Sequence, residues 1–275
     1  NPQDVGRVSL LTDLSAAIGT EQLYPHYQPL VRLDTGAIES VEALIRWNHP
    51  VYGDVPPGEF IGMAEQTDLI GPITESMFRM AIAEMLTLGP DMPRLSVNVA
   101  ARNLLDRQFA STVLQIVNEL NFPAQMLEIE ITERDILTNS DRGSIALDRL
   151  RAHGVRIAID DFGTGYSSFL SLRDLNADRL KIDQQFTSQI IGSPADELIV
   201  TKVIEIAHAL GLDVVAEGVE SASVWGRLSQ LGCDVAQGYA IARPMPLAAL
   251  REWIDARTPV ADDFTDDRKI EVLAS

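Results

Sequence analysis

The sequence predicts an α/β protein whose eight strands close into a barrel, with the first strand antiparallel to the others. Short apolar runs rich in Val, Ile and Leu alternate with amphipathic segments of helical period, which is typical of a parallel sheet covered by helices. Eight such units in 275 residues match the size of a TIM-like (β/α)8 barrel. The first two runs are joined by only Asp34, Thr35 and Gly36, a link too short for a helical crossover, so it predicts a hairpin. The predicted fold is a modified TIM-like (β/α)8 barrel with an antiparallel first strand.

The candidate strands follow one another through the central part of the chain. In order, they are residues 27–33, 40–47, 95–100, 127–132, 155–162, 179–183, 212–219 and 234–239. Residues 105–120 and 195–212 are examples of the amphipathic segments that separate them.

The two ends of the chain differ from this pattern. Residues 1–20 predict an entry helix or a linker from a possible upstream domain, and residues 21–257 predict the barrel domain. Residues 258–275 contain the polar stretch ADDFTDDRK, which predicts an acidic tail or linker. Because the chain begins with Asn1 rather than methionine, we expect it to be a segment of a longer protein.

Composition and charge limit the partners of the protein. Its 46% hydrophobic and 23% charged residues are typical of a folded globular chain. The formal net charge of −18 argues against binding to duplex nucleic acid, which depends on many Lys and Arg contacts with phosphates. Cys233 is the only cysteine, so no intramolecular disulfide can form and a reducing compartment is expected. The sequence has no signal-peptide pattern and no run of about 18 apolar residues. We therefore expect a cytoplasmic location, either for a free protein or for the cytoplasmic part of a larger membrane-anchored protein.

Polar side chains lie within or at the ends of seven of the candidate strands. They are Glu42, Asn98, Glu130, Asp160, Asp161, Lys181, Asp183, Glu217 and Gln237. A single residue of this kind could be an isolated structural polar group. The same pattern in seven strands is not explained in this way. Barrel enzymes gather their working groups at the C-terminal ends of the strands, so we expect these side chains to converge.

The converging carboxylates predict a metal site. Four or five of them would share a small volume with Lys181, one of only three lysines, and one ammonium cannot neutralise them. Carboxylate and amide oxygens suit Mg²⁺ or Mn²⁺ better than Zn²⁺, and the adjacent Asp160 and Asp161 are suited to joining two ions. Two ions about 3.5–4 Å apart activate a water and clamp a phosphoryl centre, so the predicted chemistry is phosphodiester hydrolysis. Lys181 would either orient or deprotonate the water, or supply charge to the transition state.

The motifs that carry these residues resemble those of one family. SVEALIRWNHP (40–50), IEITE (129–133), DDFGTGYSS (160–168), RLKID (179–183), VVAEGVES (214–221) and QGY (237–239) occur in the order found in the EAL-domain phosphodiesterases. These enzymes open the ring of the bacterial messenger cyclic di-GMP, and the resemblance covers roughly residues 20–255. It implies a barrel with an antiparallel first strand, in agreement with the hairpin.

The resemblance also implies roles for individual residues. The implied metal ligands are Glu42, Asn98, Glu130, Asp160, Asp161 and Glu217. The implied catalytic residues are Lys181, Glu42, Asp160, Asp161 and Glu217. The implied substrate contacts are Gln28, Leu30, Arg46, Asp183 and Gln237. The guanidinium of Arg46 matches phosphate geometry, although a structural ion pair would also explain this residue. Glu133 would anchor a mobile loop hinged at Gly163 and Gly165 and coupled to homodimerisation, and Glu220 would either support the site or be structural.

Three functions stay open. The first is hydrolysis of cyclic di-GMP to linear pGpG with two Mg²⁺ or Mn²⁺ ions, and Ca²⁺ is expected to be inhibitory. The second is a catalytically silent cyclic di-GMP receptor or protein-interaction module, although such relatives usually lack one of the implied residues. The third is a barrel enzyme for another phosphorylated substrate. A fused GGDEF or sensor domain is possible in the full-length protein.

Overall fold

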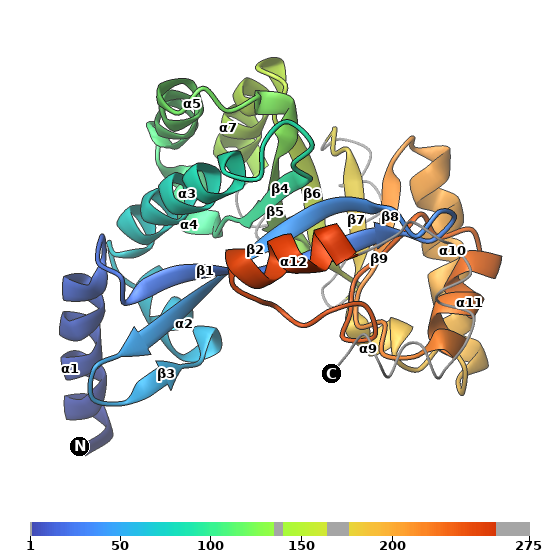
Figure 1. Ribbon diagram of the computed structural model, residues 1–275, viewed down its shortest axis with the longest axis horizontal. Helices are drawn as coiled ribbons and strands as arrows, with labels where there is room; N and C mark the ends of the chain where they lie inside the picture. The colour runs from blue at the N-terminus through green and yellow to red at the C-terminus, as the bar shows by residue number, and fades with distance from the viewer. Residues whose placement is uncertain (1, 135–139, 164–175, 257–275) are drawn as a thin grey trace.

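The computed structural model describes residues 2–134, 140–163 and 176–256. Within them, eight strands form a closed barrel (Figure 1). The strands are β1 (Leu23–Arg32), β2 (Ile38–His49), β4 (Arg94–Asn98), β5 (Leu127–Thr132), β6 (Arg156–Phe162), β7 (Arg179–Ile182), β8 (Asp213–Ala216) and β9 (Val235–Ala236). They are ordered β1-β9-β8-β7-β6-β5-β4-β2, and the pairing of β1 with β2 closes the ring. The predicted barrel and its eight strand segments are confirmed.

The barrel is irregular at β1, as the short hairpin link predicts. β1 is antiparallel to both of its neighbours, β2 and β9, whereas the other neighbouring strands of the ring are parallel. The turn between β1 and β2 is closed by the Gly36 amide, which donates to the Arg32 carbonyl at 2.9 Å. Gly36 has a φ of 67°, a conformation that glycine adopts without strain.

β2 leaves the barrel before it ends. It pairs with β4 only from Ser40 to Ala43. Its last residues, Trp47–His49, pair instead with β3 (Gly53–Val55), a strand that the sequence analysis did not predict. Strands β1 and β2 therefore continue past the barrel as a two-stranded ribbon (Figure 1). α1 (Pro2–Ala17) and α2 (Pro57–Glu65) pack beside this ribbon.

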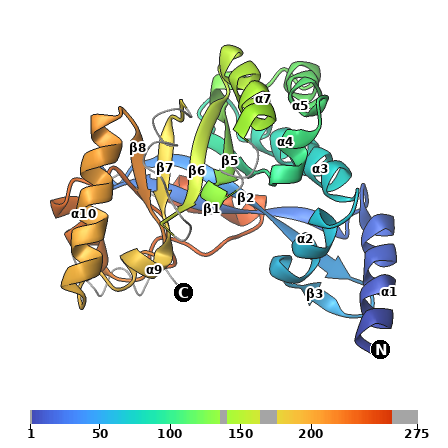
Figure 2. The ribbon, with the colours of Figure 1, turned by 180° about the vertical axis from the view of Figure 1, so that it is seen from behind.

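Helices cover the outside of the barrel in two groups (Figure 2). The first group, with the 3-10 helix η1 (Ala124–Met126), comprises α3 (Ile70–Leu86), α4 (Ala101–Leu105), α5 (Phe109–Glu119) and α7 (Ser140–Ala152). The second comprises α9 (Gln184–Thr187), α10 (Pro194–Ala209) and α11 (Ala222–Gln230). α12 (Leu247–Ala256) lies across β1, where its Leu250 joins the same core as α3 (Figure 1). The predicted helical segments 105–120 and 195–212 correspond to α5 and α10, each shorter than predicted. Among the described residues, no helix combines the length and the apolar character needed to cross a membrane.

Three apolar cores lie between the strands and the helices. One joins β2 and β4–β6 to α3, α5 and α7, and a second joins β6–β9 to α10 and α11. In the third, Leu14 and Ala17 of α1 are fully buried against Leu23, Trp47 and Phe60. The predicted domain boundaries, after residues 20 and 257, stay predictions, and the predicted tail, residues 258–275, lies outside the described residues.

The barrel interior is layered. Leu30, Val215 and Val235 form an inner apolar layer with no exposed surface. Val215 stands between Asp213 and Glu217 among the inward-facing positions of its strand, because side chains alternate between the two faces. Polar groups therefore lie on both sides of the inner apolar layer, one set at each end of the barrel.

An ion-pair network fills the N-terminal end of the barrel. Arg179 is fully buried, and its Nη1 donates to Glu128 Oε1 at 2.9 Å and to Ser40 Oγ at 3.3 Å. Its Nη2 also pairs with Glu39. Arg156 completes the network with a contact of 3.4 Å from Nε to Glu128 Oε2. Charges at this depth are tolerated only when partners surround them, so we expect this network to be sensitive to the loss of one member.

Replacing Arg179 with methionine should lower the free energy of unfolding by about 3–5 kcal/mol, because the buried Glu128 loses its close ion pair and keeps only a neutral hydrogen bond from Ser96 and the longer contact with Arg156. Urea denaturation monitored by circular dichroism measures this change. The matched control is Lys202→Met, which removes an exposed ion pair with Glu205 and should change the free energy by less than about 1 kcal/mol. Equal effects in the two variants would contradict a special role for the buried network.

Candidate active site

Four acidic side chains surround one lysine at the C-terminal end of the barrel. Lys181 on β7 is fully buried, and its Nζ lies 2.7 Å from both Glu130 Oε2 and Glu217 Oε1. The same atom lies 3.1 Å from Asp160 Oδ1 and 3.4 Å from Glu42 Oε2. The structure thus brings together residues of β2, β5, β6 and β7 and the residue that follows β8.

Amide side chains hold Glu42 from both sides. Asn98 Nδ2 donates to Glu42 Oε1 at 2.5 Å, and Gln237 Nε2 donates to Glu42 Oε2 at 2.7 Å. Gln237 also donates to Gln28 Oε1 at 3.1 Å, and Gln28 Nε2 donates to the Ala242 carbonyl at 3.1 Å. Glu42 is therefore fixed in orientation by groups that come from β4, β1 and the end of β9.

A bulge in β6 explains how two adjacent aspartates serve one site. Neighbouring side chains of a regular strand point to opposite faces of the sheet. Here the pairing of β6 with β7 shifts between Ile159 and Phe162, and Asp161 has a φ of 54°. Carboxylate oxygens of Asp160, Asp161 and Glu217 consequently lie within 4.8 Å of one another. A bulge of this kind re-aims a side chain, and its unusual backbone conformation is typical of functional sites.

The crowded carboxyl groups bind protons more tightly than usual. Burial raises the pKa of Glu217 to about 8, with Lys181 opposing the shift and Asp160 adding to it. Burial also raises the pKa of Asp161 to about 6, and the charges of Asp160 and Asp183 act in the same direction. The site therefore carries more negative charge than its own cations can stabilise.

The deepest carboxylate lacks a partner for one of its oxygens. Glu130 is fully buried, and its Oε1 accepts no hydrogen bond from the part of the chain that the structure describes, while Oε2 contacts Lys181. Burial, followed by repulsion from Glu42, raises the pKa of Glu130 well above its usual value. Burial alone would lower the pKa of Lys181, but the carboxylates around it raise it well above its usual value. A buried oxygen without a partner, in a site whose donors are carboxylates and an amide, fits a hard divalent cation.

The remaining predicted residues lie at different places around this cluster. Arg46 is half-buried, and its Nη1 donates to the Ile45 carbonyl at 2.9 Å. Asp183 Oδ1 accepts the Gln185 amide at 2.8 Å, which caps α9. Leu30 belongs to the inner apolar layer and has no exposed surface, so the structure does not bring it to a cavity.

The predicted loop anchor and hinge are partly described. Glu133 Oε2 accepts the Gly163 amide at 3.1 Å. Gly163 has a φ of 102°, and a Cβ atom there would lie 2.6 Å from the Phe186 ring, so both the conformation and the space require glycine. Gly165 lies outside the described residues. Glu220 is exposed and lines a cavity beside the acidic cluster.

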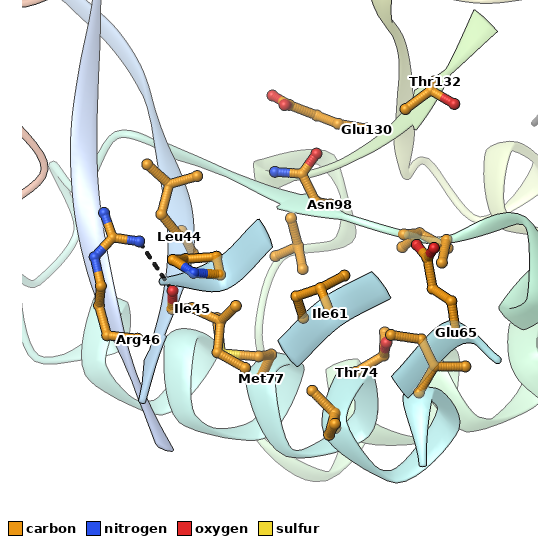
Figure 3. A pocket seen from close by; sticks show the side chains of 17 residues that line it. Leu44, Ile45, Arg46, Ile61, Glu65, Thr74, Met77, Asn98, Glu130 and Thr132 are labelled. Carbon is orange, nitrogen blue, oxygen red and sulfur yellow. Dashed lines mark hydrogen bonds between the residues drawn. The ribbon is translucent and has the colours of Figure 1, made fainter. Parts of the chain in front are cut away.

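Two cavities open next to the acidic cluster. One, of about 290 Å³, lies between β2, β4, α2 and α3, and Figure 3 shows Ile61 and Met77 in its wall with Asn98 and Glu130 at its inner end. It exists because β2 separates from β4 after Ala43. The sequence analysis missed its apolar lining, because such residues look like ordinary core positions of amphipathic helices.

The second cavity has a volume of about 230 Å³ and is lined by Gln28, Glu42, Glu217, Gln237 and Tyr239, among others. Tyr239 was also missed as a lining residue. Its signal was its position two residues after Gln237, since an aromatic residue beside a polar strand end is a common ligand contact. Arg243 stacks on the Tyr239 ring at 4.2 Å from the ring centroid.

The barrel and its acidic centre define a class of α/β protein with an oxygen-ligand site suited to divalent metals. Comparison with known proteins identifies the family: the EAL domain model matches residues 11–244, so the chain belongs to the EAL domain family. Membership of this family implies the use of a divalent metal, consistent with the acidic cluster.

Similar proteins are named as cyclic di-GMP phosphodiesterases. PA2567 of Pseudomonas aeruginosa is 40% identical over 249 residues, which is 90% of this chain and 42% of that protein. NbdA of the same organism is 39% identical over 247 residues, covering 89% of this chain and 32% of that protein. The structure of the PaMucR phosphodiesterase in complex with c-di-GMP aligns with a TM-score of 0.83 and 38% identity, over 88% of this chain and 99% of that one. The chain thus spans less than half the length of PA2567 and NbdA.

The metal-free protein should become less stable as the pH rises. The pKa of Asp161 is raised from 3.8 to about 6 and that of Glu217 from 4.5 to about 8, so the folded state binds more protons than the unfolded chain over this interval. Stability contributed by these protons is present below the unfolded pKa values and is lost as the pH rises through the folded ones. Thermal unfolding in EDTA should therefore give a lower Tm at about pH 8 than at about pH 5.

Glu217→Gln provides the control, because it removes the carboxyl group whose pKa is raised to about 8 and should reduce the difference in Tm between the two pH values. Excess Mg²⁺ should also reduce it, since cations favour the deprotonated carboxylates. A metal-free Tm that falls equally in the wild type and in Glu217→Gln would contradict the assignment of this effect to Glu217.

Proposed function

We propose that this chain is a metal-dependent phosphodiesterase domain that hydrolyses cyclic di-GMP to linear pGpG. The observation that carries the proposal is the convergence of four carboxylates on the buried Lys181, with no expected residue replaced. Membership of the EAL domain family and the names of PA2567 and NbdA support the substrate. The receptor alternative is less favoured, because the loss of catalysis in such a module would allow this costly cluster of charges to be lost.

Six residues of the cluster would hold the metal. They are Glu42, Asn98, Glu130, Asp160, Asp161 and Glu217, and their all-oxygen chemistry favours two Mg²⁺ or Mn²⁺ ions. When bound, such ions supply an activated water and stabilise charge on the phosphoryl oxygens. Gln237 and Asn98 hold Glu42 in place, and the β6 bulge directs Asp160 and Asp161 to the same side of the strand.

Lys181 best fits the role of supplying positive charge. Its Nζ has four carboxylate oxygens within 3.4 Å, so every proton of the ammonium group has an acceptor. An ammonium held in this way can orient the neighbouring carboxylates and stabilise the negative charge that develops on the phosphoryl group.

The substrate would lie across the C-terminal end of the barrel. Arg46 would bind the phosphate that is not cleaved, and Gln28, Asp183 and Gln237 would position the remainder of the ligand near the metals. Leu30 would contribute by packing beneath Gln28 rather than by touching the ligand, because it is fully buried. The two cavities beside the cluster provide space for parts of the dinucleotide.

The setting of the domain is also part of the proposal. The contact between Glu133 and Gly163 supports a loop that begins next to the metal ligands and couples to a homodimer. MucR, a relative that is 37% identical, is named as a bifunctional diguanylate cyclase and phosphodiesterase, which supports a fused GGDEF domain in the full-length protein. A cytoplasmic location follows from the bacterial messenger that serves as the substrate.

Glu42→Gln should abolish formation of pGpG while the Tm stays close to that of the wild type, because it removes a charge from an overcrowded cluster. Product analysis by liquid chromatography in Mg²⁺ or Mn²⁺ measures the activity. EDTA should abolish wild-type turnover, excess metal should restore it, and Ca²⁺ should support binding but little turnover. Wild-type protein that binds cyclic di-GMP but makes no pGpG in either metal would instead support the receptor function. If another cyclic dinucleotide displaces cyclic di-GMP in competition, the assigned substrate is wrong.

Lys181→Met should lower kcat by about 100-fold or more, because it removes the positive charge next to the reacting phosphoryl group. The dissociation constant of cyclic di-GMP, measured in Ca²⁺, should change much less than kcat. Lys202→Met is the matched control, because Lys202 on α10 is exposed and its ammonium group forms an ion pair with the exposed Glu205, outside the acidic cluster. A Lys181→Met enzyme that turns over at nearly the wild-type rate would refute the role given to this residue.

A further inference from the structure

The ribbon of β1 and β2 continues the inner wall of the barrel beyond the acidic cluster. Residues of the two strands face each other in three successive same-face pairs, which are Gln28 with Glu42, His26 with Leu44, and Tyr24 with Arg46. Gln28 and Glu42 point into the barrel, where Gln237 bonds to both. Because side chains alternate along a strand, the other two pairs lie on the same face and extend it by about 14 Å.

The opposite face of β1 points away from this wall. Tyr27 has no exposed surface, and its hydroxyl donates to Glu84 Oε2 of α3 at 2.8 Å. Tyr24 and His26 are partly exposed, and their ring centroids lie 5.5 Å apart at an interplanar angle of 63°. Two aromatic rings are thus presented on the face that leads from the acidic cluster to Arg46.

Both rings lie beside neighbouring polar groups. Asp54 of β3 acts on the Tyr24 hydroxyl and raises its pKa, and the backbone of Pro244 acts on the His26 ring. Burial and then the positive charge of Arg46 lower the pKa of His26, so its ring is neutral at neutral pH. A fixed, neutral aromatic surface beside a guanidinium is suited to a planar base attached to a phosphate.

We propose that Tyr24 and His26 form the binding surface for one guanine base of the dinucleotide, next to Arg46. This inference rests on the proposed function, since it assigns a further part of the same substrate. The charge of Arg46 would hold the phosphate, one of the two rings would stack on the flat face of the attached base, and the other ring, inclined at 63° to the first, would contact the edge of the base. Tyr24 and His26 are thereby residues that determine specificity, and they take no part in the chemical step.

The test separates binding of the base from chemistry at the phosphate. Tyr24→Ala and His26→Ala should each raise the dissociation constant of cyclic di-GMP, measured by calorimetry in Ca²⁺, by about 5- to 100-fold. At saturating cyclic di-GMP and Mg²⁺, kcat should fall by much less than the affinity in both variants, because neither ring touches the reacting phosphoryl group. Tyr24→Phe keeps the ring and should bind within about threefold of the wild type. Tyr24→Leu keeps apolar packing without the ring and replaces Tyr24→Ala should the latter fail to fold.

Tyr52→Ala is the matched control, because Tyr52 lies near the same ribbon, is 66% exposed and stacks on His49. Its affinity for cyclic di-GMP should equal that of the wild type. Unchanged affinity in Tyr24→Leu and His26→Ala would overturn the inference, as would a loss of kcat as large as the loss of affinity. If the wild-type protein binds cyclic di-GMP without cleaving it, the proposed hydrolysis is refuted but the base site is not. The affinities of the variants would then still test the base site. A wild type that binds no cyclic di-GMP would overturn both.

Discussion

The contact of Lys181 with four carboxylates is the constraint on which the site depends. One buried ammonium group holds together carboxylates from three strands and from the residue after a fourth, at distances of 2.7–3.4 Å. It does not neutralise them: burial and repulsion between the carboxylates raise the pKa values of Glu130 and Glu217, and one oxygen of Glu130 has no hydrogen-bond partner among the described residues. The barrel thus holds a cluster of carboxylates that needs further positive charge. A divalent cation would supply this charge, and carboxylate and amide oxygens are the ligands that such a cation prefers.

The irregular start of the barrel gives this charged centre a surface for a ligand. A regular barrel would continue β2 alongside β4, and the space between them would be closed by hydrogen bonds. Here β2 turns towards β3 after Ala43, which opens a cavity bordered by α2 and α3 and leaves the β1–β2 ribbon standing above the cluster. The antiparallel hairpin therefore determines both where the cavity lies and which side chains of β1 and β2 line the approach to Glu42.

Much of the fold, and the gathering of charged residues at one end of the barrel, could be predicted from the sequence, because both depend on repeated local patterns. Eight apolar runs predicted the strands, and the three-residue link predicted the direction of β1. β3 was missed because GDV is short and contains glycine and aspartate, which have low strand propensity. The bulge at Asp161 was also beyond prediction, since nothing in the sequence specifies the backbone conformation that turns its carboxylate towards Asp160.

Other features of the site depend on contacts between segments far apart in the chain. The partial burial of Arg46 and the position of Leu30 inside the barrel follow from how the strands close, and a motif in one strand carries no information about this. The apolar wall of the larger cavity has the same origin, because Ile61 and Met77 become lining residues only when β2 leaves β4. Sequence patterns thus identify which groups carry charge, whereas tertiary packing decides which of them reach a ligand.

The two polar ends of the barrel have a consequence for the alignment of β7. Arg179 and Lys181 stand two residues apart on this strand and face the interior, while Leu180 and Ile182 face the helices. A slip of one residue would expel both cations into the apolar layer beneath α10 and would push two aliphatic side chains against the acids. The buried charges therefore fix the register of β7 relative to its neighbouring strands. The same side chains that form the candidate active site thus also disfavour misaligned pairing during folding.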